Sequence, residues 1–332
     1  MSLPRSYVDG FLVEWEEGEY KAQVKMARQQ SQAIEPKVPS VKILGSGKAR
    51  TTASTALRAQ AIRERLARTA RGVPEVMVKI TSSCKGIRQI GRHLDYISRK
   101  GQIDLEDQDG LTLRGKDRIR ELKDDWRTGG PEPIADTSDR RDTLNIVFSM
   151  PAHTDEVAMK RAVRAFAAGE FSGHQYVFAY HTQATDPDPD PPAHPHVHLA
   201  VKTLGWRGHR LNPRKADLQR WRGAFAAQLR EHGIEANATS RLARLKLDRG
   251  ESRSKIALEE KGQAVDAAPA PKSTARAEKA RKLEADRIAY YELAARTLAQ
   301  SEDPVDRQLS GDLTRSLSPN PTEPQRNRTK SR

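Results

Sequence analysis

The sequence has little of what defines several common protein classes. Its one cysteine, Cys84, cannot form an internal disulfide, and a solitary thiol is typical of a reducing compartment. No stretch approaches the roughly 20 consecutive apolar residues that a membrane-spanning helix needs. Residues 1–10 lack the apolar core of a secretory signal. We therefore expect a cytoplasmic protein without membrane insertion.

Acidic residues are too few to balance the basic ones. The chain has 58 Lys and Arg against 44 Asp and Glu, which gives a net charge of +14. Such an excess favours a polyanionic partner, either nucleic acid or an anionic membrane surface. No amphipathic segment has the character of a lipid-binding helix, so nucleic acid is the expected partner.

Bulky apolar residues are scarce toward both ends of the chain, and aromatic residues make up only 5% of it. The pattern predicts a basic, partly helical N-terminal extension at 1–72, with a helix at 54–70. A compact domain is expected at 73–250. A low-complexity tail with helical character at 273–299 is expected to fill 251–332. Both extensions are expected to be flexible and basic.

Apolar periodicity between the extensions predicts both strands and helices. Strands are expected at 76–80, 144–150, 175–182 and 195–204. Helices are expected at 86–99, 115–127, 155–169 and from Pro213 to about Gly233. The run Asp186-Pro187-Asp188-Pro189-Asp190-Pro191-Pro192 can only be a loop. Strands joined by loops and intermixed with helices predict an α+β domain with a mostly antiparallel sheet.

Three of the nine histidines lie close together near residue 196. Alternate residues of a strand share a face, so His196 and His198 project together. His194 has the same parity, but ligands at i, i+2 and i+4 would span about 13 Å, too far for bonds of about 2.1 Å. A hairpin would bring His181 beside the pair. We predict a three-histidine cation site from His181, His196 and His198, with His194 beside it as a supporting or substrate-side group. The alternative is that these are surface or pH-responsive histidines.

Tyr96 lies roughly 140° from the apolar stripe of its expected helix. That stripe consists of Ile87, Ile90, Leu94 and Ile97. Tyr96 instead shares its side with Arg88, Arg92 and Arg99, whose charge would favour a phenolate. A phenolate close to a cation could attack phosphorus, so we predict Tyr96 as a nucleophile. The alternative is an ordinary exposed tyrosine.

These residues, in this order, resemble the conjugative relaxases, or mobilisation nucleases, of the MOB-P class. That class belongs to the HUH-type endonuclease superfamily and serves type IV secretion. The resemblance rests on three segments, supported by His232-Gly233-Ile234 further on, and covers about residues 75–245. The three segments are Tyr96-Ile97-Ser98-Arg99, His181, and His194-Pro195-His196-Val197-His198.

The resemblance implies a fold of about five antiparallel strands flanked by helices and a bound Mg²⁺ or Mn²⁺. It also implies cleavage of single-stranded DNA at a transfer origin, with the 5′ end left on Tyr96. Relaxosome accessory proteins and a type IV coupling protein would be partners, and the protein could be exported with its attached DNA. Relatives carry an acidic residue where this chain has Gln183, so Asp186 or Asp188 is expected to replace it.

Basic residues on both sides of the expected site suggest a groove for single-stranded DNA. Trp206 would offer a base a stacking surface. The remaining candidates are Arg88, Arg92, Arg99, Lys202, Arg207 and Arg210.

Three other functions remain open at this stage. A rolling-circle replication initiator of the same superfamily would use Tyr290 or Tyr291 as nucleophile. A non-catalytic DNA-binding accessory protein would explain the charge but not the histidines. A cupin-like oxygenase would explain the histidines but not the charge.

Overall fold

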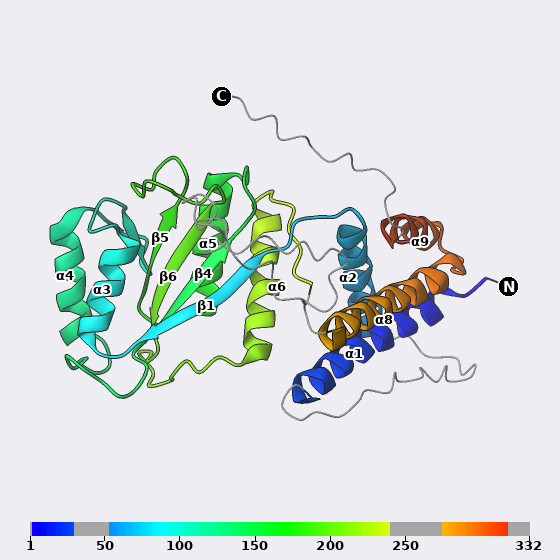
Figure 1. Ribbon diagram of the computed structural model, residues 1–332, viewed down its shortest axis with the longest axis horizontal. Helices are drawn as coiled ribbons and strands as arrows, with labels where there is room; N and C mark the ends of the chain where they lie inside the picture. Colours follow the sequence, from blue (N-terminus) through cyan, green and yellow to red (C-terminus); the bar gives the residue numbers. More distant parts are fainter. Residues whose placement is uncertain (1, 30–52, 240–273, 318–332) are drawn as a thin grey trace. The chain divides into compact units, whose positions relative to one another are not determined.

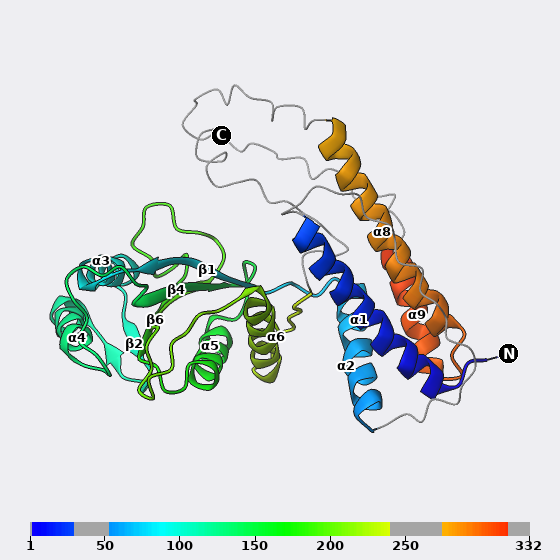
Figure 2. The same cartoon turned by 90° about the horizontal axis from the view of Figure 1, so that it is seen from below.

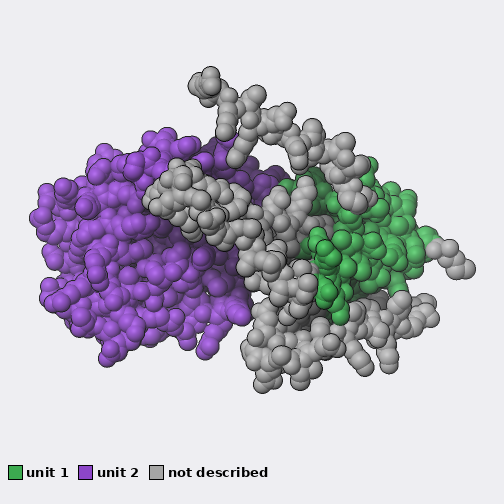
Figure 3. Space-filling view, viewed as in Figure 1, with its two compact units in different colours: residues 1–72, 239–332 green, residues 73–238 purple. Residues whose placement is uncertain are grey.

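The computed structural model describes residues 2–29, 53–239 and 274–317. These residues fall into two compact units, coloured separately in Figure 3. We call residues 73–238 the central unit, and the described helices from the two ends of the chain the terminal unit. The expected end of the compact domain at residue 250 lies outside the described residues.

The central unit is built on a sheet whose six strands follow the order β1-β4-β6-β5-β2-β3 (Figure 1). Every neighbouring pair runs antiparallel, which confirms the expected α+β class. The resemblance implied about five strands. The sequence pattern itself predicted only β1, β4, β5 and β6, because β2 and β3 are too short to show alternation. The strands are β1 (Met77–Cys84), β2 (Leu105–Asp107), β3 (Thr112–Leu113), β4 (Thr143–Ser149), β5 (Tyr176–His181) and β6 (His196–Lys202).

Helices cover both faces of this sheet. The helices are α3 (Ile87–Ile97), α4 (Gly115–Thr128), α5 (Glu156–Glu170) and α6 (Lys215–Glu231). Val197, Leu199 and Val201 of β6 enter the core beneath α5 and α6, which lie side by side in Figure 2. Ala200 of β6 enters the second core, with α3 and α4. His196 and His198 share the parity of Ala200, so they lie on the α3 side.

The terminal unit joins helices from opposite ends of the chain: α1 (Arg5–Gln29), α2 (Ala53–Ala70), α8 (Thr274–Ala299) and α9 (Pro304–Leu317). The expected helices at 54–70 and 273–299 are confirmed. The two extensions were expected to be flexible or weakly helical; their described helices pack around a common core that includes Leu12, Leu66 and Leu298. Each helix contributes few apolar residues, and only their association makes a core. None of the described helices is long and apolar enough to cross a membrane.

Tyr290 and Tyr291 belong to this core and pack against Trp15. The Tyr290 ring stacks on Trp15 at 4.5 Å between centroids, and the Tyr290 hydroxyl donates to the Trp15 carbonyl. Tyr291 is buried and meets the same indole edge-on. Both rings therefore have a structural role in the packing of α8 against α1.

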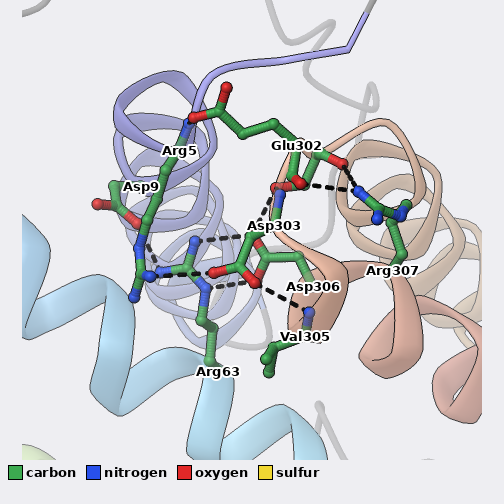
Figure 4. Close-up of polar contacts among 9 residues, drawn as sticks. Arg5, Asp9, Arg63, Glu302, Asp303, Val305, Asp306 and Arg307 are labelled. Atoms are coloured by element: carbon green, nitrogen blue, oxygen red, sulfur yellow. Dashed lines mark hydrogen bonds and ion pairs between the residues drawn. The ribbon is translucent and has the colours of Figure 1, made fainter.

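A buried arginine connects three helices of the terminal unit (Figure 4). Arg63 of α2 donates to Asp9 of α1 and through two nitrogens to Asp306 of α9. The Ser301 hydroxyl donates to the same Asp306 carboxylate at 2.8 Å. All four side chains are buried, so the carboxylates depend on Arg63 for their neutralisation.

We expect Arg63→Ala to lower the free energy of unfolding of the terminal unit by about 3–5 kcal/mol, because it leaves two buried carboxylates without their counter-charge. Hydrogen exchange at the slowest amides of α1 and α9 would measure the loss. Arg58→Ala is the matched control, since Arg58 pairs with Glu17 on the surface and should cost about 0–1 kcal/mol. Equal effects of the two substitutions would contradict the assignment.

Candidate metal centre and nucleophile

Strand pairing brings His181, His196 and His198 together. His181 ends β5 directly opposite His196, and His198 follows two residues along β6. One ring nitrogen of each histidine lies within 4.8 Å of the others. A cation with bonds of about 2.1 Å holds its ligand atoms up to about 4.2 Å apart. A small movement of the three rings toward one another would therefore allow one cation to bind all three nitrogens. As predicted, the pairing of β5 with β6 brings His181 beside His196 and His198.

Burial favours the neutral imidazoles that a cation requires. Desolvation lowers the pKa of His198 to about 2 and that of His196 to about 4. Both rings are therefore neutral at physiological pH, with a lone pair on one nitrogen. The Nδ1 of His196 lies 3.3 Å from the His194 carbonyl, which leaves Nε2 for a ligand. His194 itself is exposed, and its ring lies 5.8 Å from that of His196.

His181 is fully buried and held at both ring nitrogens. Its Nδ1 lies 2.8 Å from Asp186 Oδ2, and its Nε2 lies 2.7 Å from the Ile97 carbonyl oxygen. A carboxylate on the far nitrogen is the usual support for a metal-binding histidine. Asp186, one of the two acidic residues expected to replace the missing one, therefore contacts His181, while Gln183 is exposed. A cation at Nε2 would displace the contact of this nitrogen with the Ile97 carbonyl.

Tyr96 lies on the last turn of α3, beside the histidines. Its apolar neighbours on the helix are buried as expected, while Tyr96 is 53% exposed. The phenol ring meets the His198 ring edge-on at 5.6 Å between centroids. The guanidinium carbon of Arg99 lies 5.0 Å from the centre of the same ring. An exposed hydroxyl-bearing ring therefore adjoins the histidine cluster.

Arg99 is directed at carboxylates, contrary to the expected role in binding DNA. Its Nε and one terminal nitrogen donate to the two oxygens of Asp186 at 2.8 and 2.9 Å. The same terminal nitrogen lies 3.5 Å from Asp188. Arg88 and Arg92 remain exposed on α3, and Arg88 makes a loose ion pair with Asp136.

The prediction of Lys202 as a DNA contact is wrong. Lys202 is only 3% exposed, and its ammonium group donates to the Gly129 carbonyl and lies over Trp126. Desolvation lowers its pKa to about 8. The residue shares the parity of His198, so it points beneath the helices that cover that face. A lysine at the end of a strand is expected to be exposed, but Lys202 is covered by Trp126 of α4.

The structure also separates the expected groove into two places. Trp206, Arg207 and Arg210 follow the end of β6, whereas the histidines lie at its beginning, about 20 Å away at ~3.3 Å per residue. Trp206 and Arg207 are exposed, while Arg210 donates to the Thr203 hydroxyl and the Arg141 carbonyl.

A cavity of about 730 Å³ opens at this second end of the sheet. Its basic lining consists of His174, Arg207, His209, Arg210, Arg214 and Arg220. Glu170 already pairs with Arg220, which leaves the other arginines with more of their charge available. Only Arg207 and Arg210 of these six could be predicted from the sequence, because isolated basic residues on separate segments form no motif.

His93 is a further site residue that the sequence analysis missed. Its ring stacks near Tyr96 at 6.2 Å between centroids, one helical turn before it. Among the described residues its buried Nε2 has no hydrogen-bond partner, and burial lowers its pKa to about 4. The spacing of three residues from Tyr96 was the one available signal.

The open antiparallel sheet flanked by helices is consistent with the HUH-like fold that the resemblance implied. In agreement, residues 100–234 match the family model of the relaxases, described as the MobA/VirD2-like nuclease domain. This match supports the resemblance to the relaxases found in the sequence, over the part of the chain that the model covers.

Two curated relatives are similar to part of the chain. The T-DNA border endonuclease VirD2 of Rhizobium radiobacter is 30% identical over 189 residues, which are 51% of this chain and 43% of the relative. The protein of the same name from Agrobacterium fabrum strain C58 is 30% identical over 128 residues, 34% of this chain and 28% of the relative. The matched region thus spans less than half the length of either relative.

Proposed function

We propose that the central unit nicks single-stranded DNA at a transfer origin, with Tyr96 as the nucleophile. One observation carries the proposal: the exposed Tyr96 ring lies 5.6 Å, between centroids, from the ring of His198, a member of the histidine cluster. A nucleophile beside a candidate cation site is the arrangement that phosphodiester cleavage requires. The basic net charge of +14 suits the DNA substrate.

We assign His181, His196 and His198 as the residues that hold a divalent cation, Mg²⁺ or Mn²⁺. The donor set fits: two of the rings are neutral through burial, and Asp186 supports the third. When bound, the cation would supply Lewis-acid polarisation of the scissile phosphate. Three ligands leave further coordination positions open for a substrate oxygen.

The chemistry of Tyr96 is a transesterification. The phenol oxygen forms a bond to phosphorus, and the bond from phosphorus to the 3′ oxygen breaks. The phenol loses its proton, and the departing 3′ oxygen gains one. The product is a 5′-phosphotyrosine and a free 3′-hydroxyl, so the bond energy is kept for rejoining. Arg99 places a positive charge 5.0 Å from the ring, which stabilises negative charge on the phenol oxygen.

The relatives suggest the biological setting. They are named T-DNA border endonucleases, and we infer that this chain also cleaves one strand at a defined site to begin the transfer of a plasmid or mobile element. Relaxosome accessory proteins and a type IV coupling protein would be its partners. The reaction would take place in the cytoplasm, where the origin DNA lies.

The rival functions fit the structure less well. A replication initiator using Tyr290 or Tyr291 would need rings that here pack against Trp15. A cupin-like oxygenase would need a β-barrel instead of an open sheet with helices on both faces. A purely DNA-binding role gives no account of three converging histidines beside an exposed tyrosine.

The direct test uses the full chain, Mn²⁺ and single-stranded oligonucleotides that tile the DNA next to its gene. A covalent adduct that survives denaturing electrophoresis, and is absent with excess chelator, would support the proposal. If no oligonucleotide of the series gives an adduct, the chain is not a nicking enzyme for this DNA, and the proposed function fails.

We further propose that the cavity at the end of β6 contacts DNA phosphates. Replacing Arg207 and Arg210 together with alanine should reduce the slope of log K against log salt by about 1–2, at roughly 0.7 per lost single-strand contact. Fluorescence anisotropy at several salt concentrations would measure it. Arg118 and Arg120, exposed on α4, provide the control pair. An unchanged slope would place the binding charge in residues 1–72 or 251–332.

A further inference from the structure

The Tyr96 side chain is poorly restrained by its own helix. It is on the final turn of α3 and is 53% exposed, and its aromatic neighbours among the described residues are the rings of His93 and His198. An exposed side chain near a helix end samples several rotamers. Attack on phosphorus requires the reacting atoms to be held in a defined geometry. Another group must therefore fix Tyr96 at the histidine cluster.

The turn that follows α3 directs Arg99 back over Tyr96. Arg99 and Lys100 adopt φ angles of 49° and 58°, a left-handed conformation that residues other than glycine rarely take. The Arg99 amide nitrogen donates to the Tyr96 carbonyl, which closes the turn. As a result the guanidinium carbon lies 5.0 Å from the centre of the phenol ring. Local strain of this kind persists where the surroundings hold it in place.

The carboxylate of Asp186 provides that hold. Arg99 donates to both of its oxygens, and the carboxylate side chain is fully buried. The same Oδ2 accepts from His181 Nδ1 at 2.8 Å. Asp186 thus joins the turn beside Tyr96 to a candidate metal ligand.

His181 has a second connection to this turn, through Nε2 and the Ile97 carbonyl at 2.7 Å. That nitrogen cannot serve both the carbonyl and a cation. When a cation occupies the site, the link through Asp186 to Arg99 is the one that can persist.

From these contacts we propose that Arg99 is a positioning residue, which holds Tyr96 at the metal centre through Asp186. This inference rests on the proposed function. In this role Arg99 orients the nucleophile Tyr96 and does not bind the DNA backbone. It also predicts that the planar, two-pronged shape of the guanidinium matters as well as its charge, since a lysine cannot donate to both carboxylate oxygens in the same fixed geometry.

The test measures single-turnover adduct formation by Arg99→Lys at saturating oligonucleotide and Mn²⁺. We expect the rate to fall about 10–100-fold, the range found when supporting contacts of a site are lost. The dissociation constants for DNA and Mn²⁺ should stay within about threefold of wild type, because the charge is retained and the histidines are untouched. Arg114→Lys is the control, since Arg114 makes a comparable forked pair with Asp104 on the surface; its rate should not change.

Asp186→Asn should lower both the rate and the Mn²⁺ affinity, because it weakens the support of His181 as well as the pair with Arg99. The double variant should be no slower than Asp186→Asn alone, since the two residues act through one contact. If Arg99→Lys does not fold, Arg99→Gln gives a second test, because it removes the forked pair and leaves the contact of Asp186 with His181 in place.

Two results would overturn the inference. An unchanged rate at saturating DNA, with weaker binding and a smaller salt slope, would make Arg99 a phosphate contact. If Arg99→Lys loses as much Mn²⁺ affinity as Asp186→Asn does, Arg99 acts on the metal ligands and not on Tyr96. If wild type itself gives no adduct, the proposed function fails, which is a different outcome.

Discussion

Replacing Tyr96 with phenylalanine is expected to abolish the covalent protein–DNA adduct and leave single-stranded DNA binding within about twofold of wild type. The substitution removes only a hydroxyl from an exposed ring, so folding and packing should change by less than about 0.5 kcal/mol. The hydroxyl oxygen is the atom that bonds to phosphorus, and without it no tyrosyl phosphate can form. Denaturing gels would report the adduct, and anisotropy would report binding.

Two other tyrosines serve as matched controls. Tyr180 lies on β5 with its hydroxyl near Met159, and Tyr290 packs against Trp15. Tyr180→Phe and Tyr290→Phe should both retain adduct formation. An adduct formed by Tyr96→Phe and lost in Tyr290→Phe would move the nucleophile to the terminal unit and revive the replication-initiator reading.

The second large effect is expected at the histidine cluster. Alanine at His181, His196 or His198 should weaken Mn²⁺ binding by more than about 100-fold and remove nicking at ordinary metal concentrations. Loss of even a supporting contact costs about 10–100-fold in metal affinity, and a site with three protein ligands has none to spare. Isothermal titration with Mn²⁺ would measure each affinity.

His194 separates this assignment from its closest alternative. It contacts His196 through its main-chain carbonyl, which an alanine variant keeps. His194→Ala should therefore bind Mn²⁺ within about threefold of wild type, the scale of a surface substitution. If His194→Ala loses as much affinity as His181→Ala, or if His181→Ala loses none, the ligand set is wrong.

Much of the sheet and the cluster could be predicted because the relevant signals are local. The parity of β6 places His196 and His198 on one face, and β5 ends in His181, whichever helices cover them. The apolar stripe of α3 likewise fixes the side from which Tyr96 projects. β2 and β3 escaped prediction because strands of three and two residues carry no periodicity.

The terminal unit shows the opposite case. Leu12, Leu66 and Leu298 lie on helices that are weakly apolar when taken singly, and the sequence therefore indicated loose extensions. Arg63, Asp9 and Asp306 are far apart in the chain, and nothing in their neighbourhoods marks them as partners. Their association is a property of packing between distant segments.

The sequence by itself determined the type of site, because strand parity and helical period act between near neighbours along the chain. Only the tertiary structure decided that Asp186 meets His181 and that Arg99 turns to Asp186 instead of DNA. It also decided that Lys202 is covered by α4 and that Trp206 lies at the far end of β6 from the histidines. Each of these outcomes depends on the path of a loop or on which helix covers a face, and those are set by contacts between segments that no local pattern encodes.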